Sequence, residues 1–171
     1  MPEPLIDYRD HIRKLTGRDR YDLTPLLADR TVFHRAVHDL AAPFQGRGVA
    51  KVAALDALGF ALGGGVAHAL DAGLVLIRKE EKVMWHAETV SVEDYSRTVK
   101  TFALVRDAIR PGEKVLVVDD WSETGAQLRA AFRLVERSRG RVAGAALLHV
   151  DEPVRRDPDL AGYTLHHLFD Y

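Results

Sequence analysis

The sequence KVLVVDDWSETGAQ, residues 114–127, predicts a buried strand that leads through a short loop into a helix. Residues 115–118 are continuously apolar and rich in valine, which is typical of a strand covered on both faces. Asp119 and Asp120 interrupt this run, so we expect the strand to end there, with both carboxylates at the carboxyl edge of a sheet. The helix expected from Thr124 adds an N-terminus whose N–H groups and dipole suit a phosphate. The stretch therefore predicts a site for a phosphate-bearing ligand.

Chain length, composition and charge restrict the class of protein. The chain has 171 residues, 47% apolar and 29% charged, which is enough for one soluble globular domain with its own core. Its net charge of −1 gives no overall attraction to nucleic acid or membrane, and the absence of cysteine excludes disulfides and cysteine-bound metals. The first residues are charged, and no stretch approaches the ~20 apolar residues of a membrane span. We therefore expect a cytoplasmic protein that binds neither nucleic acid nor membrane.

Strands and helices alternate through the middle of the chain. Apolar β-branched runs predict strands, and apolar residues spaced by three and four predict helices. The alternation between residues 49 and 150 favours a parallel sheet with helices on both faces. Residues 83–103 lack a strong period and are expected to form a long excursion with some β character, as functional lids do. The other expected strands span 49–55, 74–77, 142–150 and 163–169, and the other expected helices span 5–16, 29–46 and a region from about Phe60 that contains Gly63, Gly64 and Gly65.

The opening stretch resembles the fingerprint of type I phosphoribosyltransferases, which is four apolar residues, two acids, a short variable segment and Thr-Gly. Nearly the whole chain is similar to the adenine phosphoribosyltransferase branch of that family. The resemblance implies an α/β fold, a parallel twisted sheet flanked by helices, in a single domain over residues 1–171. It also implies a small hood from residues 1–28 and 160–171 and a mobile loop at 83–103. The matching segments, in the family's order, are DLTPLLADRTVF (22–33), VAALDALGFALG (52–63), VLIRKEEK (75–82), DAIRPGEKVLVVDD (107–120) and YTLHHLFDY (163–171).

The resemblance implies a reaction in which a purine or purine-like base displaces pyrophosphate from phosphoribosyl pyrophosphate (PRPP) and gives a nucleoside 5′-monophosphate. It implies PRPP as co-substrate, Mg²⁺ as cofactor and a homodimer. Such chemistry needs anchored phosphates, charge neutralisation and a proton carrier at the base. By resemblance, Asp119 and Asp120 hold the ribose hydroxyls directly, through Mg²⁺ or through water. The other implied contacts are the 5′-phosphate loop Glu123, Thr124, Gly125, Ala126 and Gln127, the pyrophosphate loop Asp56, Ala57 and Leu58, the cations Arg78, Lys79 and Lys82, and the base-contacting residues Arg20, Tyr21, Asp22 and Trp121.

Three positions depart from the adenine branch. Leu58 stands where that branch has an arginine before Gly-Phe. The family's hood contains Glu-Tyr-Gly, whereas the corresponding residues 95–97 are Tyr-Ser-Arg and the nearby acids are Glu93 and Asp94. Gln127 replaces the hydroxyl residue that closes the phosphate loop. These departures fit an alternative function, a non-catalytic PRPP- or nucleotide-binding regulatory protein with the same fold.

Glu123 is the most unusual residue of the phosphate loop. A carboxylate 4 Å from a phosphate is unfavourable by about 1–4 kcal/mol, depending on the effective dielectric. The hypoxanthine-guanine branch nevertheless carries an acid at this place, where it handles the proton of the purine imidazole ring. Our hypothesis is that Glu123 takes over this task from the missing hood glutamate, which favours a 6-oxopurine or an altered ring as the base. Selectivity also depends on residues after strand 142–150, such as Asp151 and Glu152.

Several of these residues also have a purely structural explanation. Thr124 and Gln127 fit a T-x-x-Q capping box, which many non-binding helices have. The mixed charges of residues 78–82 fit a solvated turn, and Trp121 fits a core or dimer contact as well as a base contact. No metal-ligand spacing involves the histidines of the second half of the chain, so structural zinc is not expected; these are His86, His149, His166 and His167.

Overall fold

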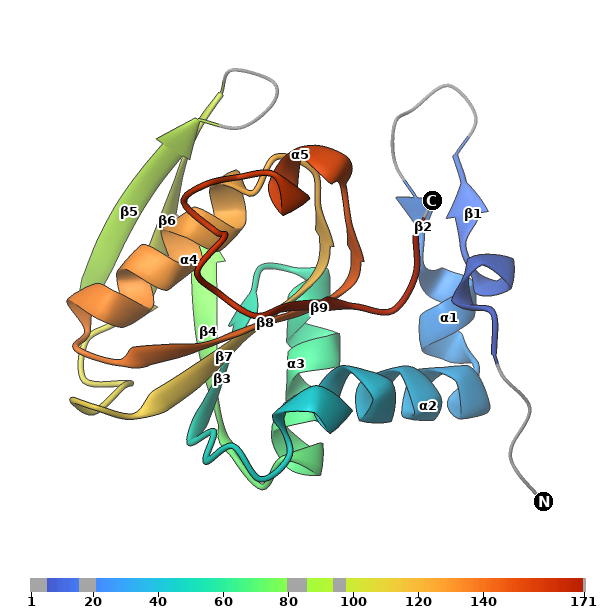
Figure 1. Cartoon of the computed structure of the whole chain (residues 1–171), viewed down its shortest axis with the longest axis horizontal. Coiled ribbons are helices and arrows are strands. Elements are labelled where there is room, and N and C mark those ends of the chain that lie inside the picture. Colours follow the sequence, from blue (N-terminus) through green and yellow to red (C-terminus); the bar gives the residue numbers. More distant parts are fainter. Residues whose placement is uncertain (1–5, 16–20, 80–85, 94–97, 171) are drawn as a thin grey trace.

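The computed structural model describes residues 6–15, 21–79, 86–93 and 98–170 and is built around one seven-stranded sheet (Figure 1). The strand order is β5-β6-β4-β3-β7-β8-β9. Strands β4, β3, β7, β8 and β9 are parallel, as expected, and an antiparallel hairpin of β5 and β6 is added at the β4 edge. The bounds are β3 Lys51–Leu55, β4 Gly73–Lys79, β5 Ala87–Glu93, β6 Val99–Val105, β7 Lys114–Ser122, β8 Arg141–Val150 and β9 Leu165–His167.

Helices cover both faces of this sheet and enclose two apolar cores (Figure 1). Helix α4 packs on one face, against β5 to β8, whereas α3 packs on the other face against β3, β4 and β7, with α2 beside it. Central strand β7 contributes to both cores, because Val115 and Val117 face one layer and Leu116 and Val118 face the other. The α/β fold class is therefore confirmed. The helices are α1 Thr24–Ala28, α2 Arg30–Ala41, α3 Leu58–Ala69, α4 Ala126–Arg137 and α5 Glu152–Arg155, with 3₁₀ turns η1 Tyr8–His11 and η2 Ala42–Phe44.

The helix expected at residues 29–46 begins as its sequence predicts. The Asp29 side chain accepts hydrogen bonds from the backbone N–H groups of Thr31 at 2.8 Å and Val32 at 3.0 Å. These bonds satisfy two of the N–H groups that a helix start leaves without partners. The α-helix ends at Ala41 and continues as the η2 turn.

The expected N-terminal helix is wrong over the residues that the structure describes. Residues 8–11 form only the η1 turn, and Arg13–Lys14 is a strand, β1, which pairs antiparallel with β2, Tyr21–Asp22. The expected helix had only three apolar residues, Leu5, Ile12 and Leu15, which are too few to form a continuous apolar face along twelve residues. The Tyr8 hydroxyl donates to Asp39 Oδ2 at 2.7 Å, which ties η1 to α2. The η1 turn and strands β1 and β2 lie beside the C-terminal segment in Figure 1, and Tyr8, Ile12 and Phe169 belong to the same apolar core.

The excursion expected at residues 83–103 is a sheet hairpin wherever the structure describes it. Strands β5 and β6 pair over seven positions, from Ala87 opposite Val105 to Glu93 opposite Val99. Their inward-facing Val90 and Phe102 are buried beneath α4, and this burial favours strands over a loop. Residues 83–85 and 94–97, which include the hood positions 95–97, lie outside the described residues.

Two of the three glycines in α3 allow close packing. A Cβ at Gly63 would lie 2.5 Å from Ala54 Cβ, and one at Gly65 would lie 2.5 Å from Val37 Cγ2. Gly64, between them, has no atom within 4 Å of such a Cβ. Contact with strand β3 and helix α2 thus accounts for Gly63 and Gly65. Among the described residues, no helix is long and apolar enough to cross a membrane.

Candidate active site

Three segments with predicted site residues meet at the carboxyl edge of the sheet, because β4, β3 and β7 are parallel neighbours. Strand β4 ends with Arg78 and Lys79, and the Asp56–Leu58 segment connects β3 to α3. The Asp56 N–H donates to the Ile77 carbonyl at 3.0 Å, which holds that segment against β4. Strand β7 brings Asp119 and Asp120 to the other side of the same segment.

The two consecutive acids occupy different environments. Asp119 is 4% exposed, and its Oδ1 accepts a hydrogen bond from the Asp120 N–H at 2.9 Å. Burial, followed by the negative charge of Asp120, raises the pKa of the Asp119 carboxyl well above its ordinary value. Asp120 is only half-buried. The site therefore combines a desolvated carboxyl group with one that faces solvent.

The expected end of the central strand at the acids is wrong, because β7 continues through Ser122. Trp121 pairs with His149 of β8 and Ser122 pairs with Val150, so ladder pairing to β8 outlasts the apolar run. This extension carries Trp121 past the acids, to the edge of the sheet.

Arg78 is a cation with unused hydrogen-bonding capacity in this edge. Its Nε is buried and makes no hydrogen bond to any residue that the structure describes. Its guanidinium carbon lies 5.9 Å from the centre of the Phe60 ring, on α3. Lys79 is half-buried beside it, Lys82 lies outside the described residues, and Leu58 presents an apolar side chain that is 41% exposed.

The phosphate loop is closed by a glycine and held by an ion pair. Gly125 has φ of +74° and precedes the first residue of α4, and Thr124 is exposed. Arg129 donates to the Thr124 carbonyl at 3.2 Å and also pairs with Asp157. The capping-box explanation is wrong, because Gly125 occupies the N-cap and no side chain caps the helix. The N-terminus of α4 thus points into the loop that follows the acids.

Aromatic rings form a stack beside the acids. The Tyr21 ring lies on Trp121, with centroids 4.4 Å apart and planes inclined by 13°. His149 covers the other face at 4.3 Å, and Phe169 contacts the stack edge-on at 6.1 Å. Two predicted base contacts, Tyr21 and Trp121, are therefore brought together from positions 100 residues apart. Asp22 Oδ1 instead accepts from the Thr24 N–H at 2.9 Å, at the start of α1. Hydrogen bonding to the Thr24 side chain, followed by this backbone bond, lowers the pKa of Asp22. Arg20 lies outside the described residues.

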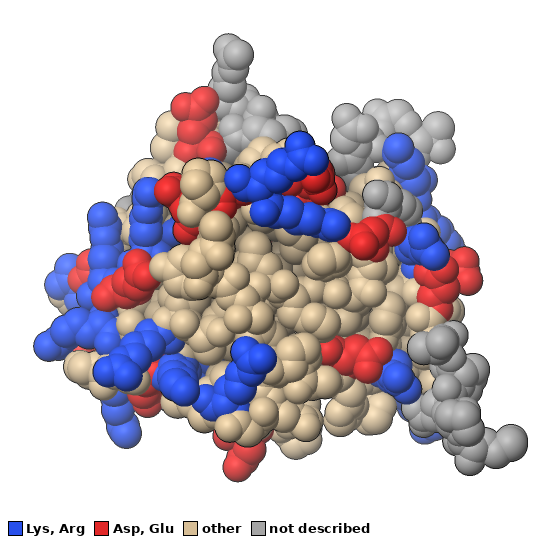
Figure 2. Space-filling view, in the orientation of Figure 1, with Lys and Arg blue, Asp and Glu red and all other residues tan. Residues whose placement is uncertain are grey.

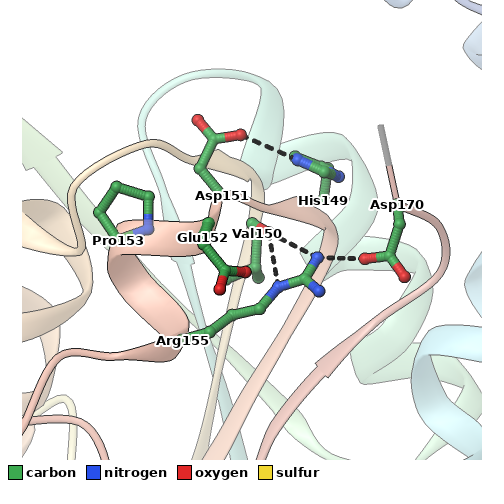
Figure 3. A pocket seen from close by; sticks show the side chains of 7 residues that line it. All are labelled: His149, Val150, Asp151, Glu152, Pro153, Arg155 and Asp170. Carbon is green, nitrogen blue, oxygen red and sulfur yellow. Dashed lines mark hydrogen bonds and ion pairs between the residues drawn. The ribbon is translucent and has the colours of Figure 1, made fainter.

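A pocket of about 380 Å³ adjoins this stack at the end of β8 (Figure 3). His149 and Asp151 face each other on one side of it, and Arg155 bridges the Val150 carbonyl and Asp170. Sequence reasoning placed Asp151 near the base but assigned His149 no role. A histidine and an acid two residues apart at the end of a buried strand were the available signal. The described residues contain no group of three or more His, Cys, Asp or Glu side chains that could hold a metal ion by themselves.

The close approach of α3 to Asp119 can be tested with two glycine variants. A Cβ at Gly59 would lie 3.0 Å from Asp119 Oδ1 and 3.0 Å from the Val118 carbonyl oxygen. Because the backbone oxygen cannot move away cheaply, Gly59→Ala should destabilise the fold by about 1–3 kcal/mol in urea unfolding. In the same helix, the unobstructed Gly64→Ala should stabilise by about 0.5–1 kcal/mol. Equal effects of both variants would contradict the close packing at Gly59.

Comparisons with known proteins agree with this fold. Residues 38–165 match the family model described as phosphoribosyl transferase domain. An adenine phosphoribosyltransferase of Rhizobium johnstonii is 39% identical over 155 residues, covering 88% of this chain and 84% of that protein. One from Cereibacter sphaeroides is 42% identical over 151 residues, covering 85% and 83%. The crystal structure of adenine phosphoribosyltransferase from Rhodothermus marinus superposes with a TM-score of 0.86 at 34% identity, covering 94% of each chain.

The chain therefore belongs to the type I phosphoribosyltransferase family, and the resemblance to its adenine branch is confirmed. It is a pentosyltransferase of the purine type, which moves a 5-phosphoribosyl group between PRPP and a purine base with release of pyrophosphate. The alternative of a non-catalytic regulatory protein is not favoured by these relatives.

Proposed function

We propose that the purine base is adenine and that PRPP binds across the carboxyl edge of β4, β3 and β7. The observation that carries this proposal is the convergence at one edge of an acidic pair, a partly unpaired arginine and a helix N-terminus. The named activity of relatives at about 40% identity supports adenine as the base. Glu123, which suggested a 6-oxopurine, makes hypoxanthine the competing base to test.

In this arrangement the 5′-phosphate binds the start of α4. Backbone N–H groups of a loop and a helix N-terminus suit a dianion, and the loop here comprises Thr124, Gly125, Ala126 and Gln127. The buried Arg78 Nε lacks a partner that an oxyanion would supply, so the pyrophosphate lies against Arg78 and the Asp56–Leu58 segment. Lys79 and Lys82 contribute further positive charge. With Leu58 in place of an arginine, Arg78 carries more of the electrostatic stabilisation of the leaving group.

The acidic pair suits Mg²⁺ delivered with PRPP. Mg²⁺ takes oxygen ligands, and sites that handle phosphates commonly use one or two carboxylates together with substrate oxygens. Asp120, half-buried and next to the buried Asp119, provides such an oxygen donor without a dedicated protein cage. When bound, the ion neutralises charge on the departing pyrophosphate. Asp119 and Asp120 orient the ribose hydroxyls, directly or through water.

The base binds at the aromatic stack, on the Tyr21 side of Trp121. The opposite face of Trp121 is occupied by His149, which is 2% exposed and held by two hydrogen bonds. A base inserted between Tyr21 and Trp121 requires their separation to grow from 4.4 Å to about 7 Å, twice the contact distance of stacked carbon atoms. Tyr21 lies in the two-stranded N-terminal sheet, outside the main sheet, and is the ring that moves.

We also propose a closing hood, a homodimer and a cytoplasmic location. A hood from residues 1–28 and 160–171 and a mobile loop at 83–103 would exclude water from the site.

Figure 2 shows charged side chains around the rim of one face and few in its middle, where β8 and β9 run in Figure 1. Charged residues are depleted at interface centres, which supports a homodimer, to be tested by sedimentation velocity. A cytoplasmic location follows from the expected metabolic role and is tested by cell fractionation.

One assay tests the proposed function. The protein is incubated with PRPP, Mg²⁺ and one base at a time from adenine, hypoxanthine and guanine, and pyrophosphate and nucleotide are quantified. We expect adenosine 5′-monophosphate with stoichiometric pyrophosphate, and little product from the other bases. Turnover confined to hypoxanthine would overturn adenine as the base, and absence of product with every base would overturn the proposed function and favour the regulatory alternative.

A further inference from the structure

His149 is enclosed by hydrogen-bond acceptors at both of its ring nitrogens. Its Nδ1 lies 3.0 Å from the Phe169 carbonyl oxygen, and its Nε2 lies 2.9 Å from Asp151 Oδ1 (Figure 3). A carbonyl oxygen can only accept, and an ionised carboxylate can only accept. Both contacts are hydrogen bonds at once only if both ring nitrogens carry a proton, and the imidazole is then a cation.

The ring is nearly enclosed, whereas its carboxylate partner is not. The His149 side chain is 3% exposed, so a charge on it depends on both acceptors staying in place, and the Asp151 side chain is 36% exposed. Among the described residues that line the pocket, the other charged groups are Glu152 and Arg155 from α5 and Asp170 from the C-terminal segment. Arg155 is occupied by the Val150 carbonyl and Asp170, which itself also contacts His167. From β7, the packed neighbour of His149 is the uncharged Trp121, and Tyr21 of β2 lies beyond it.

This pair is connected to the indole on which the base is proposed to stack. Asp151 Oδ2 accepts from Trp121 Nε1 at 3.4 Å, while its Oδ1 receives His149. The His149 ring lies against the indole face, with centroids 4.3 Å apart, where a cation is attracted by the π electrons. The Asp151 carboxylate and the His149 ring together fix the position and the orientation of the Trp121 indole.

We propose that His149, held as an imidazolium between the Phe169 carbonyl and Asp151, is a positioning residue that locks Trp121 for base binding. When the ring gives up a proton to solvent, one nitrogen presents a lone pair to an acceptor, and that hydrogen bond is lost. The hydrogen bond that is lost is either the one to the Phe169 carbonyl or the one to Asp151, and the Trp121 side chain is then held less firmly. The role at the base rests on the proposed base site, whereas the protonation state and its link to Trp121 do not.

The variant Asp151→Asn separates proton control from packing. The Asn amide N–H can donate to an unprotonated His149 Nε2 while its carbonyl accepts from Trp121 Nε1, so a neutral ring satisfies every bond. The matched control Glu152→Gln removes a carboxylate from the same pocket, and the ion pair of Glu152 is with Arg156. His149→Gln, which loses the ring, serves only to assign its resonances.

The first experiment uses the free enzyme and needs no turnover. Nitrogen-15 NMR of the His149 ring, from about pH 5.5 to pH 8.5, should show two protonated nitrogens at the acidic end. In a Trp85→Phe background, the Trp121 indole N–H resonance should shift along the same titration. Asp151→Asn should abolish this linked shift and Glu152→Gln should retain it. A single protonated nitrogen throughout, or an indole that ignores the titration, would overturn the proposal.

The second experiment measures adenine turnover over the same pH range. As His149 deprotonates, KM for the base should rise about fivefold, which is the effect of one lost hydrogen bond. KM for PRPP should not show this rise. Asp151→Asn should remove the rise in KM for the base, and Glu152→Gln should keep it. A rise that persists in Asp151→Asn contradicts the positioning role. Absence of turnover on every base would instead refute the proposed function, and the NMR result would still decide the imidazolium and its link to Trp121.

Discussion

Asp119→Asn should lower kcat/KM for phosphoribosyl transfer by about 100-fold or more, because it removes a preorganised negative charge where positive charge develops on the ribose. Asp120→Asn should have an effect of the same order, since the two carboxylates act together at the end of β7. Steady-state kinetics with PRPP and adenine give the measurement. Asp71→Asn is the control, because Asp71 lies in an exposed turn before β4, at the opposite edge of the sheet.

The same Asp119→Asn variant should be more stable than the natural protein when no ligand is present. Burial raises the Asp119 pKa in the folded state above that of the unfolded chain, so ionised Asp119 opposes folding. This penalty is absent below the unfolded pKa and develops as pH rises through the folded pKa. The gain in Tm should therefore be larger at about pH 8 than at about pH 4. Loss of activity accompanied by loss of Tm at both pH values would contradict this account of Asp119.

Glu123→Gln should lower kcat by about 100-fold, the usual contribution of a positioned proton carrier. It should at the same time lower KM for PRPP, because a negative charge beside the phosphate loop is removed. A fall in kcat together with a fall in KM for PRPP distinguishes lost proton transfer from a damaged loop, because a damaged loop would lower kcat and raise KM for PRPP. Kinetics with adenine and with hypoxanthine show which base depends on Glu123.

The controls for this variant are conservative. Glu123→Asp keeps the carboxylate on a shorter stem and should recover part of kcat. Glu113→Gln removes a half-buried acid near the amino end of β7 and should change neither constant. Turnover of Glu123→Gln that equals that of the natural protein would falsify the proton-carrier role and return that task to the hood.

The segments that the sequence predicted well are those whose signal is local. Strand β7 followed from four consecutive apolar residues, and α2 followed from Asp29 and an apolar stripe. The acids at the end of β7 followed from the cost of burying charge, although the strand extends two residues beyond them. Hairpin β5–β6 was missed as a regular element, because its burial depends on α4, which is distant in sequence and leaves only Val90 and Val92 as a visible alternation.

The amino-acid sequence by itself determined the phosphate-binding part of this protein, because a buried strand, two acids, a loop and a helix start are contiguous between residues 114 and 127. Only the tertiary structure decided the surroundings of Trp121. Tyr21 arrives from β2, His149 from β8 and Phe169 from the C-terminal segment, and parallel pairing of β7 with β8 brings Trp121 and His149 into register. Hydrogen bonds and ring contacts depend on distance in space, so no local pattern could have placed His149 between two acceptors beneath the indole.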